Sequence, residues 1–411
     1  MGVSWHASEQ QWAAITAPLA PAVVIAGAGS GKTTLMAARV VYLVLTGQVR
    51  PDQVLGLTFT TKAATELRAR IRTALTDAGA LDDSDPEADD VLEPTVSTYN
   101  AYAAGLLTDH GLRIGHEPDT RIITDAARYQ LGARVVDRHT GVVEFLSDHP
   151  KTVIQNLLDL EGQMSEHLVG ADDVRRVDAE ALAGFRRAAD EERTGKNRIT
   201  YLRDIDKAAN ALERRAELLD LVAGYRRMKS DLGLMDFSDQ IELGARLAAD
   251  QPDVGAAERE KFKVVLLDEY QDTSVAQAIM LSRLFGGGHA VTAVGDPNQA
   301  IYGWRGASVS NILGFAETFP ASSGEVPSYP LTVNRRSDRR ILDVANRLAA
   351  PRRWWRTAAR CGRSTPSPRR RTVRSPRGSS RPSARRWLGW SRPSRRCTGP
   401  PTYRCGPTSA C

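Results

Sequence analysis

A glycine-rich loop near the N-terminus carries the first residues that could do chemistry. It reads Ala26-Gly27-Ala28-Gly29-Ser30-Gly31-Lys32-Thr33, after the apolar run 22–25 and before a helical pattern over residues 35–45. A strand, such a loop and a helix form a phosphate cradle, in which backbone N–H groups face the phosphates. Lys32 would reach the outer phosphates, and Thr33 would offer its hydroxyl to Mg²⁺. A simple glycine-rich turn explains neither residue, so the motif predicts nucleotide binding.

Two adjacent carboxylates, Asp268 and Glu269, follow a second apolar run at residues 264–267. An acid at the tip of a second buried strand can hold the Mg²⁺ that Thr33 and the phosphates bind, and the carboxylate beside it can deprotonate the attacking water. We therefore predict that Asp268 binds the metal ion and that Glu269 acts as the general base. The alternative is that both acids cap the next helix.

A third apolar run, at residues 290–296, leads to Gln299 and, a few residues later, to Tyr302, Trp304 and Arg305. Gln299 is placed to sense the terminal phosphate. Aromatic rings and a cation close to it could stack on the bases of a single strand with little sequence preference. This adjacency would couple the state of the phosphates to a base-stacking platform.

The order of apolar runs predicts an α/β fold with a parallel sheet. Runs at 22–26, 54–60, 264–268 and 290–296 have the composition of buried parallel strands, and each ends in a polar or glycine-rich corner. About 200 residues of mostly helical pattern separate the second run from the third, which is too many for one crossover. We therefore expect a helical insertion at 111–225 within a discontinuous domain of residues 1–110 and 226–320.

The composition changes abruptly near residue 350. Residues 351–411 hold 17 of the 55 basic residues and none of the 49 acidic ones, so residues 1–350 have 38 basic and 49 acidic side chains and a net charge of −11. The tail has too few aliphatic residues to bury a core and is expected to be disordered. We interpret it as the product of a frameshift; the alternative is a native basic arm that binds nucleic acid.

All four cysteines also lie in this tail, at Cys361, Cys397, Cys405 and Cys411. Their absence from residues 1–350 fits a reducing cytoplasm. No apolar run approaches the roughly 18 residues of a membrane span, and the sequence opens without a charged and then apolar leader. We expect a cytoplasmic protein without a membrane partner.

The chain resembles the UvrD/PcrA/Rep family of superfamily 1 DNA helicases, whose motifs it carries in the family's order. Gln11, in Ser8-Glu9-Gln10-Gln11, matches the adenine-reading glutamine, and Arg39 matches a nucleotide contact. Thr58-Phe59-Thr60-Thr61-Lys62-Ala63-Ala64 resembles the TFTNKAA corner, with Phe59 as a base-pocket aromatic. Thr98-Tyr99-Asn100-Ala101 corresponds to a TFHS-like DNA contact and differs from it at three of four positions.

Two further segments extend the resemblance toward residue 350. Met235-Asp236-Phe237-Ser238-Asp239 resembles the DFDDL segment, and Asn334-Arg335-Arg336-Ser337 is similar to NYRS. There Arg336 matches the arginine finger that stabilises transition-state charge. Arg335 stands where the family has a tyrosine that stacks on adenine.

The resemblance implies two RecA-like domains with ATP and Mg²⁺ between them, the second beginning at residues 321–350. It also implies an ATP-dependent DNA helicase or translocase that moves 3′ to 5′ on single-stranded or partly duplex DNA. The family's later motifs would lie beyond residue 350, so we expect this chain to be truncated and inactive or impaired. The alternative is a nucleotide-gated DNA-binding fragment without helicase activity.

The expected site residues fall into three groups. The catalytic group is Lys32, Asp268, Glu269, Gln299 and Arg336. The ATP-binding group is Gln11, Ala26, Gly27, Ala28, Gly29, Ser30, Gly31, Lys32, Thr33, Thr34 and Arg39, with Thr33 and Asp268 as the metal ligands. The DNA-binding group is Phe59, Thr60, Thr98, Tyr99, Asn100, Tyr302, Trp304 and Arg305.

Overall fold

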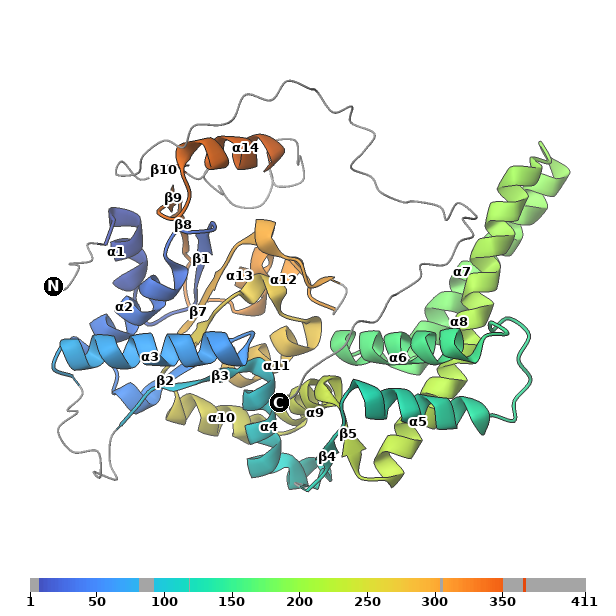
Figure 1. The fold of residues 1–411 in the computed structure, drawn as a ribbon, viewed down its shortest axis with the longest axis horizontal. Helices are drawn as coiled ribbons and strands as arrows, with labels where there is room; N and C mark the ends of the chain where they lie inside the picture. Colours follow the sequence, from blue (N-terminus) through green and yellow to red (C-terminus); the bar gives the residue numbers. More distant parts are fainter. Residues whose placement is uncertain (1–6, 81–91, 118, 304–305, 350–364, 367–411) are drawn as a thin grey trace, which may run out of the picture. The chain divides into compact units, whose positions relative to one another are not determined.

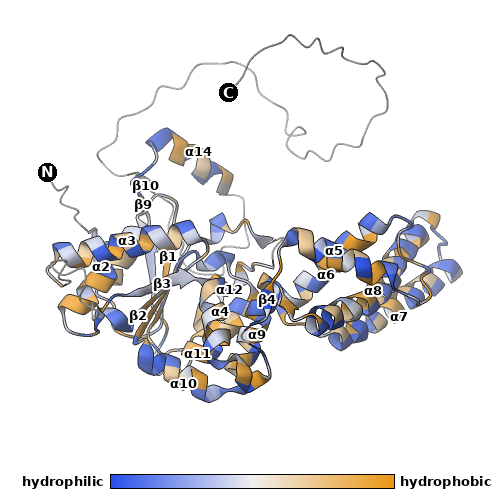
Figure 2. Ribbon diagram, turned by 60° about the horizontal axis from the view of Figure 1, so that its bottom comes forward, coloured by the Kyte–Doolittle hydropathy of each residue, from blue (hydrophilic) through white to orange (hydrophobic). Residues whose placement is uncertain are grey.

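Six parallel strands form the central sheet of the computed structural model (Figure 1). The structure describes residues 7–80, 92–117, 119–303, 306–349 and 365–366, all within one compact unit, Met1–Arg371. The strand order is β3 (Thr95–Thr98), β2 (Val54–Thr58), β6 (Val264–Leu267), β7 (Val291–Gly295), β1 (Ala22–Ala26) and β8 (Ser328–Leu331). The four predicted strands are the central ones and are buried along their whole length, which confirms the α/β fold. Figure 2 colours the same fold by hydropathy, with hydrophobic residues in orange.

Alternate residues of each central strand face two separate apolar cores. Val24 packs with the first core, against α1 (Glu9–Ile15), α2 (Lys32–Leu45) and α3 (Thr61–Asp77), whereas Val23 and Ile25 face the second. The period of two in a strand explains this division. The second core lies under six helices, which are α4 (Tyr99–His110), α9 (Phe237–Asp250), α10 (Pro252–Lys261), α11 (Val275–Phe285), α12 (Ser310–Leu313) and α13 (Phe315–Thr318).

Four helices form the insertion, namely α5 (Asp125–Asp137), α6 (Pro150–His167), α7 (Ala171–Thr194) and α8 (Ile199–Asp231). They enclose a third apolar core, and β4 (Arg121–Ile122) pairs with β5 (Leu234–Met235) where the chain enters and leaves the insertion. The expected end at residue 225 falls inside α8, because the apolar pattern that packs against α5 and α6 continues through Tyr225 to Met228. Among the described residues, no helix is long and apolar enough to cross a membrane.

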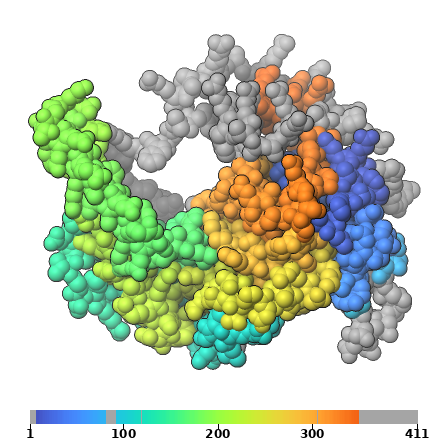
Figure 3. All heavy atoms as spheres, turned by 180° about the vertical axis from the view of Figure 1, so that it is seen from behind, coloured from blue at the N-terminus to red at the C-terminus, as the bar shows by residue number. Residues whose placement is uncertain are grey.

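The first sheet continues past residue 321, the expected start of a second domain, because β8 pairs with β1. Val23–Ala26 pairs with Ser328–Leu331 in parallel register, and Figure 3 shows the N-terminal residues (blue) beside residues of this region (orange). The short strand β9 (Val333–Asn334) and α14 (Arg339–Ala349) follow, and β9 pairs with β10 (Thr365–Pro366). The rest of the predicted tail lies outside the described residues.

Candidate functional site

The glycine-rich loop joins β1 to α2 and requires glycine at two positions. Gly29 and Gly31 have φ of +71° and +90°, values that favour glycine. A Cβ on Gly29 would lie 2.6 Å from the Cβ of Arg336, and one on Gly31 would lie 3.1 Å from Gln11 Nε2. Among the residues that the structure describes, no side chain caps the N-terminus of α2. Its first N–H groups are therefore available to phosphate oxygens.

Lys32 and Glu269 form an ion pair at the carboxyl end of β6. Lys32 Nζ lies 2.8 Å from Glu269 Oε2, and the Gln271 amide donates to the same carboxylate oxygen at 2.8 Å. Glu269 itself has a φ of +49°, a conformation that non-glycine residues adopt at a cost and that clusters at functional sites. The predicted phosphate-binding lysine and the predicted base are thus brought together at the end of β6.

Asp268 is buried, with 6% of its surface exposed, and its environment fits a metal ligand. The Thr58 hydroxyl lies 3.4 Å from Oδ2, whereas Oδ1 is buried with no hydrogen-bond partner among the described residues. Burial and the charge of Glu269 raise the pKa of this carboxyl to about 6. A buried carboxylate oxygen without a donor is what a cation would satisfy, so Asp268 fits a ligand of Mg²⁺.

Gln271 connects Glu269 to Asp296, which follows the next strand, β7. Gln271 was not among the predicted site residues. Its Oε1 accepts from the N–H of Asp296 at 3.0 Å, while its Nε2 donates to Glu269. Gln299 then donates to the Asp296 carboxylate at 2.6 Å. A chain of hydrogen bonds, which passes through the backbone N–H and the carboxylate of Asp296, therefore links the predicted base to the predicted phosphate sensor. The sequence feature that could have indicated this role is the position of Gln271 between two acids, in Glu269-Tyr270-Gln271-Asp272.

Gln11 contacts the glycine-rich loop, whereas the side chain of Arg39 contacts backbone carbonyls at the end of α1. Gln11 Nε2 donates to the carbonyl of Ser30 at 3.1 Å. Arg39 is fully buried, and its guanidinium donates to the carbonyls of Ala14, Ile15, Ala17 and Pro18. The structure thus places the Arg39 guanidinium on backbone carbonyls, and its contact with a nucleotide stays a prediction. Arg39 holds the end of α1, the helix that carries Gln11.

The predicted DNA-binding residues divide into an aromatic pair and a set of structural contacts. The rings of Phe59 and Tyr302 lie 4.7 Å apart with an interplanar angle of 31°. Thr60 and Thr98 cap α3 and α4, each accepting a backbone N–H at 3.1 Å. Asn100 donates to the Phe237 carbonyl at 3.2 Å. Trp304 and Arg305 lie outside the described residues.

Tyr99, another member of the predicted DNA-binding group, has a structural contact. Its side chain is buried, and its hydroxyl donates to the carbonyl of Asp268 at 3.0 Å. Burial, together with the charge of Asp268, raises the pKa of Tyr99 well above its ordinary value. A side chain enclosed in this way cannot contact DNA directly. It instead helps to fix the backbone that presents Asp268.

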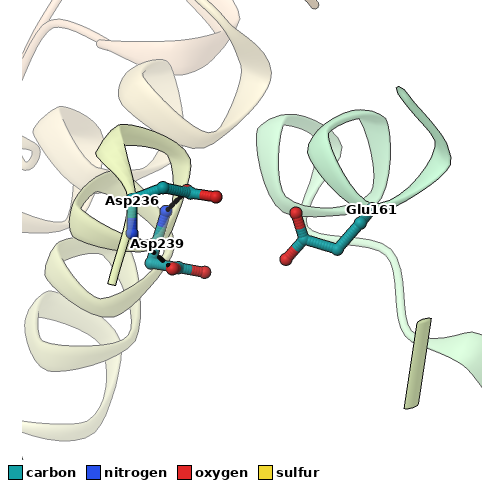
Figure 4. A group of neighbouring side chains, drawn as sticks. All are labelled: Glu161, Asp236 and Asp239. Atoms are coloured by element: carbon teal, nitrogen blue, oxygen red, sulfur yellow. Dashed lines mark hydrogen bonds between the residues drawn. The ribbon is translucent and has the colours of Figure 1, made fainter. Parts of the chain in front are cut away.

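A buried ionic cluster joins the insertion to α9. Figure 4 shows the carboxylates of Glu161, Asp236 and Asp239, whose ligand atoms lie within 4.8 Å of one another. Lys229 Nζ lies 2.8, 3.4 and 2.7 Å from them, and Arg128 Nε lies 2.9 Å from Asp236. Burial would lower the pKa of Lys229, but the three carboxylates outweigh it and raise the pKa. The lysine supplies the cation, so we assign no metal here.

The cradle, its lysine and the acid that follows a neighbouring parallel strand define the site of a P-loop nucleoside triphosphatase on a RecA-like sheet. A family described as the UvrD/REP helicase N-terminal domain matches residues 7–320. The chain belongs to this family.

Two curated relatives give the extent of the similarity. The ATP-dependent DNA helicase PcrA of Leuconostoc citreum is 32% identical over 340 residues, which is 82% of this chain and 38% of the relative. The protein of the same name from Bacillus subtilis is 28% identical over 328 residues, 80% of this chain and 37% of the relative. The chain therefore spans about two fifths of the length of these relatives.

Proposed function

We propose that the chain is the ATP-binding part of a DNA helicase or translocase that couples ATP hydrolysis to movement on single-stranded DNA. One observation carries the proposal. Gln271 and Asp296 connect Glu269, beside the phosphate cradle, to Gln299. Tyr302, which pairs with Phe59, lies three residues after Gln299. Hydrolysis and base stacking would then be coupled over one short segment.

In this proposal the backbone of the loop and Lys32 bind the phosphates. Gln11 contacts the adenine base of the nucleotide. Thr33 and Asp268 would hold Mg²⁺, which supplies neutralisation of phosphate charge when bound. Glu269 orients and deprotonates the attacking water, Gln299 senses the terminal phosphate, and Arg336 stabilises transition-state charge. Phe59 and Tyr302 offer their faces to a base. By resemblance, we propose 3′-to-5′ movement and action in the cytoplasm.

ATP turnover by the full chain, with and without single-stranded DNA, tests the proposal. DNA-stimulated turnover that Lys32→Ala abolishes would support a motor. Lys32→Ala removes the charge that meets the phosphates, and Lys207→Ala, on an exposed part of α8, is the matched control. Nucleotide-dependent DNA binding without turnover would favour the alternative of a nucleotide-gated DNA-binding fragment. Failure to bind ATP or DNA would overturn both.

A further inference from the structure

Residues 332–336 lie directly on the phosphate-binding loop and are held there at three points. The Gln10 amide donates to the Thr332 hydroxyl at 3.1 Å and accepts from the Thr332 N–H at 3.0 Å. The Asn334 amide donates to the carbonyl of Ala28. The N–H of Arg335 donates to the carbonyl of Gly29 at 2.8 Å. Two of these points are carbonyls of the loop itself.

Asn334 uses both ends of its side chain at this contact. It is buried, with 3% of its surface exposed. While Nδ2 donates to the loop, Oδ1 accepts the N–H groups of Arg336 at 2.8 Å and Ser337 at 2.7 Å. The amide is therefore a direct link between the loop carbonyl and the backbone of Arg336. Gly29 permits the close approach, because a side chain there would collide with Arg336.

We propose that Asn334 is a positioning residue, which ties the place of Arg336 to the conformation of the phosphate-binding loop, with Gln10 as the second anchor. The proposal rests on the proposed function, since it assumes that the loop binds a nucleoside triphosphate. The loop carries both the N–H groups that face phosphates and the carbonyls that Asn334 and Arg335 contact. A shift of the loop on binding is thereby passed to the backbone of Arg336.

The preference of the full chain for ATPγS over ADP tests this link, because only the triphosphate offers the terminal phosphate that Arg336 would contact. Affinities are measured by competition with a fluorescent ADP analogue. Asn334→Ala should lower the preference by about 10-fold and leave ADP affinity unchanged. This is the size expected when Arg336 loses its hydrogen bond to the charged terminal phosphate. Asn334→Asp keeps the acceptor for the two N–H groups but loses the donor to Ala28, so it should lower the preference as well. Asn156→Ala, in the insertion, is the matched control.

A double-mutant cycle separates positioning from a purely structural role. If Asn334 acts through Arg336, Asn334→Ala should change nothing further in an Arg336→Ala background. Gln10→Ala should lower the same preference in a chain with Asn334 intact, which provides a second variant if Asn334→Ala does not fold.

Two results would overturn the link while leaving the proposed function intact. One is that the variants lose affinity for ATPγS and for ADP by the same factor. The other is that the effects of Asn334→Ala and Arg336→Ala on the preference are additive in the cycle. Nucleotide binding that does not depend on Lys32 would instead overturn the proposed function and the link together. Each failure is therefore distinguishable from the other.

Discussion

Asp268→Asn should stabilise the ligand-free chain, because the native carboxylate is buried without a compensating donor at Oδ1. The expected gain depends on pH in a defined way. In the folded chain, burial and the neighbouring Glu269 raise the pKa of Asp268 from its ordinary value of 3.8 to about 6. Between these two values the folded chain holds a proton that the unfolded chain has lost. The free energy of unfolding therefore falls as pH rises through this window.

The magnitude follows from the same two values. Each pH unit between the folded and unfolded pKa corresponds to about 1.4 kcal/mol, so ionised Asp268 costs the fold about 3 kcal/mol above pH 6. At pH 5.0, where only part of the window has been crossed, the cost is about half as large. An asparagine has no such dependence. The gain of the variant over wild type should thus be about 1 kcal/mol larger at pH 7.5 than at pH 5.0.

Urea unfolding of both full chains at the two pH values, with a chelator and without nucleotide, measures this difference. Asp109→Asn, an exposed position on α4, is the matched control and should show no pH-dependent gain. The same gain for Asp268→Asn at pH 5.0 and pH 7.5 would refute the reasoning. So would a loss of stability at pH 7.5, because it would mean that the ionised carboxylate has a favourable partner in the fold.

Three other substitutions test separate contacts. Lys229→Met should lower the free energy of unfolding by about 3 kcal/mol in urea, because it leaves buried carboxylates without their central cation, whereas exposed Lys207→Met should change it little. Gly29→Ala should weaken nucleotide binding in a fluorescence titration; Gly79→Ala is the control, with a φ of +70° but nothing within 4 Å, and equal effects would exclude the clash. Arg39→Lys should cost about 2 kcal/mol in urea, since an ammonium cannot reproduce a guanidinium that serves four carbonyls; a change below about 0.5 kcal/mol would contradict this.

The central strands were predictable from sequence because a strand buried on both faces is a continuous apolar run. β3 and β8 were not predicted. They lie at the edges of the sheet, and Thr95–Thr98 and Ser328–Leu331 carry polar residues or proline, which are tolerated at an edge and weaken the apolar signal. The sequence pattern also did not show that the first sheet extends to Leu331, because this depends on which strand pairs with β1.

The site was predictable where chemistry depends on neighbours along the chain, and less so where it depends on packing. Lys32 and the acids after β6 follow from short motifs, whose spacing places them at the carboxyl ends of parallel strands. The burial of Tyr99 and Arg39 does not follow from spacing. Both residue types also occur as ligand contacts, and only the fold shows their hydrogen bonds to the carbonyls of Asp268 and of the residues after α1.

The ion pair between Lys32 and Glu269 restrains the predicted base. Lys32 Nζ lies 2.8 Å from the carboxylate that would act as base. A terminal phosphate that attracts Lys32 would share its ammonium with Glu269, as Lys229 shares its ammonium among three carboxylates, and would weaken the Lys32–Glu269 pair without having to break it. Gln271 donates to the same oxygen of Glu269 and accepts from the backbone N–H of Asp296. A shift of the predicted base would therefore be passed through Gln271 to the residue to which Gln299 donates.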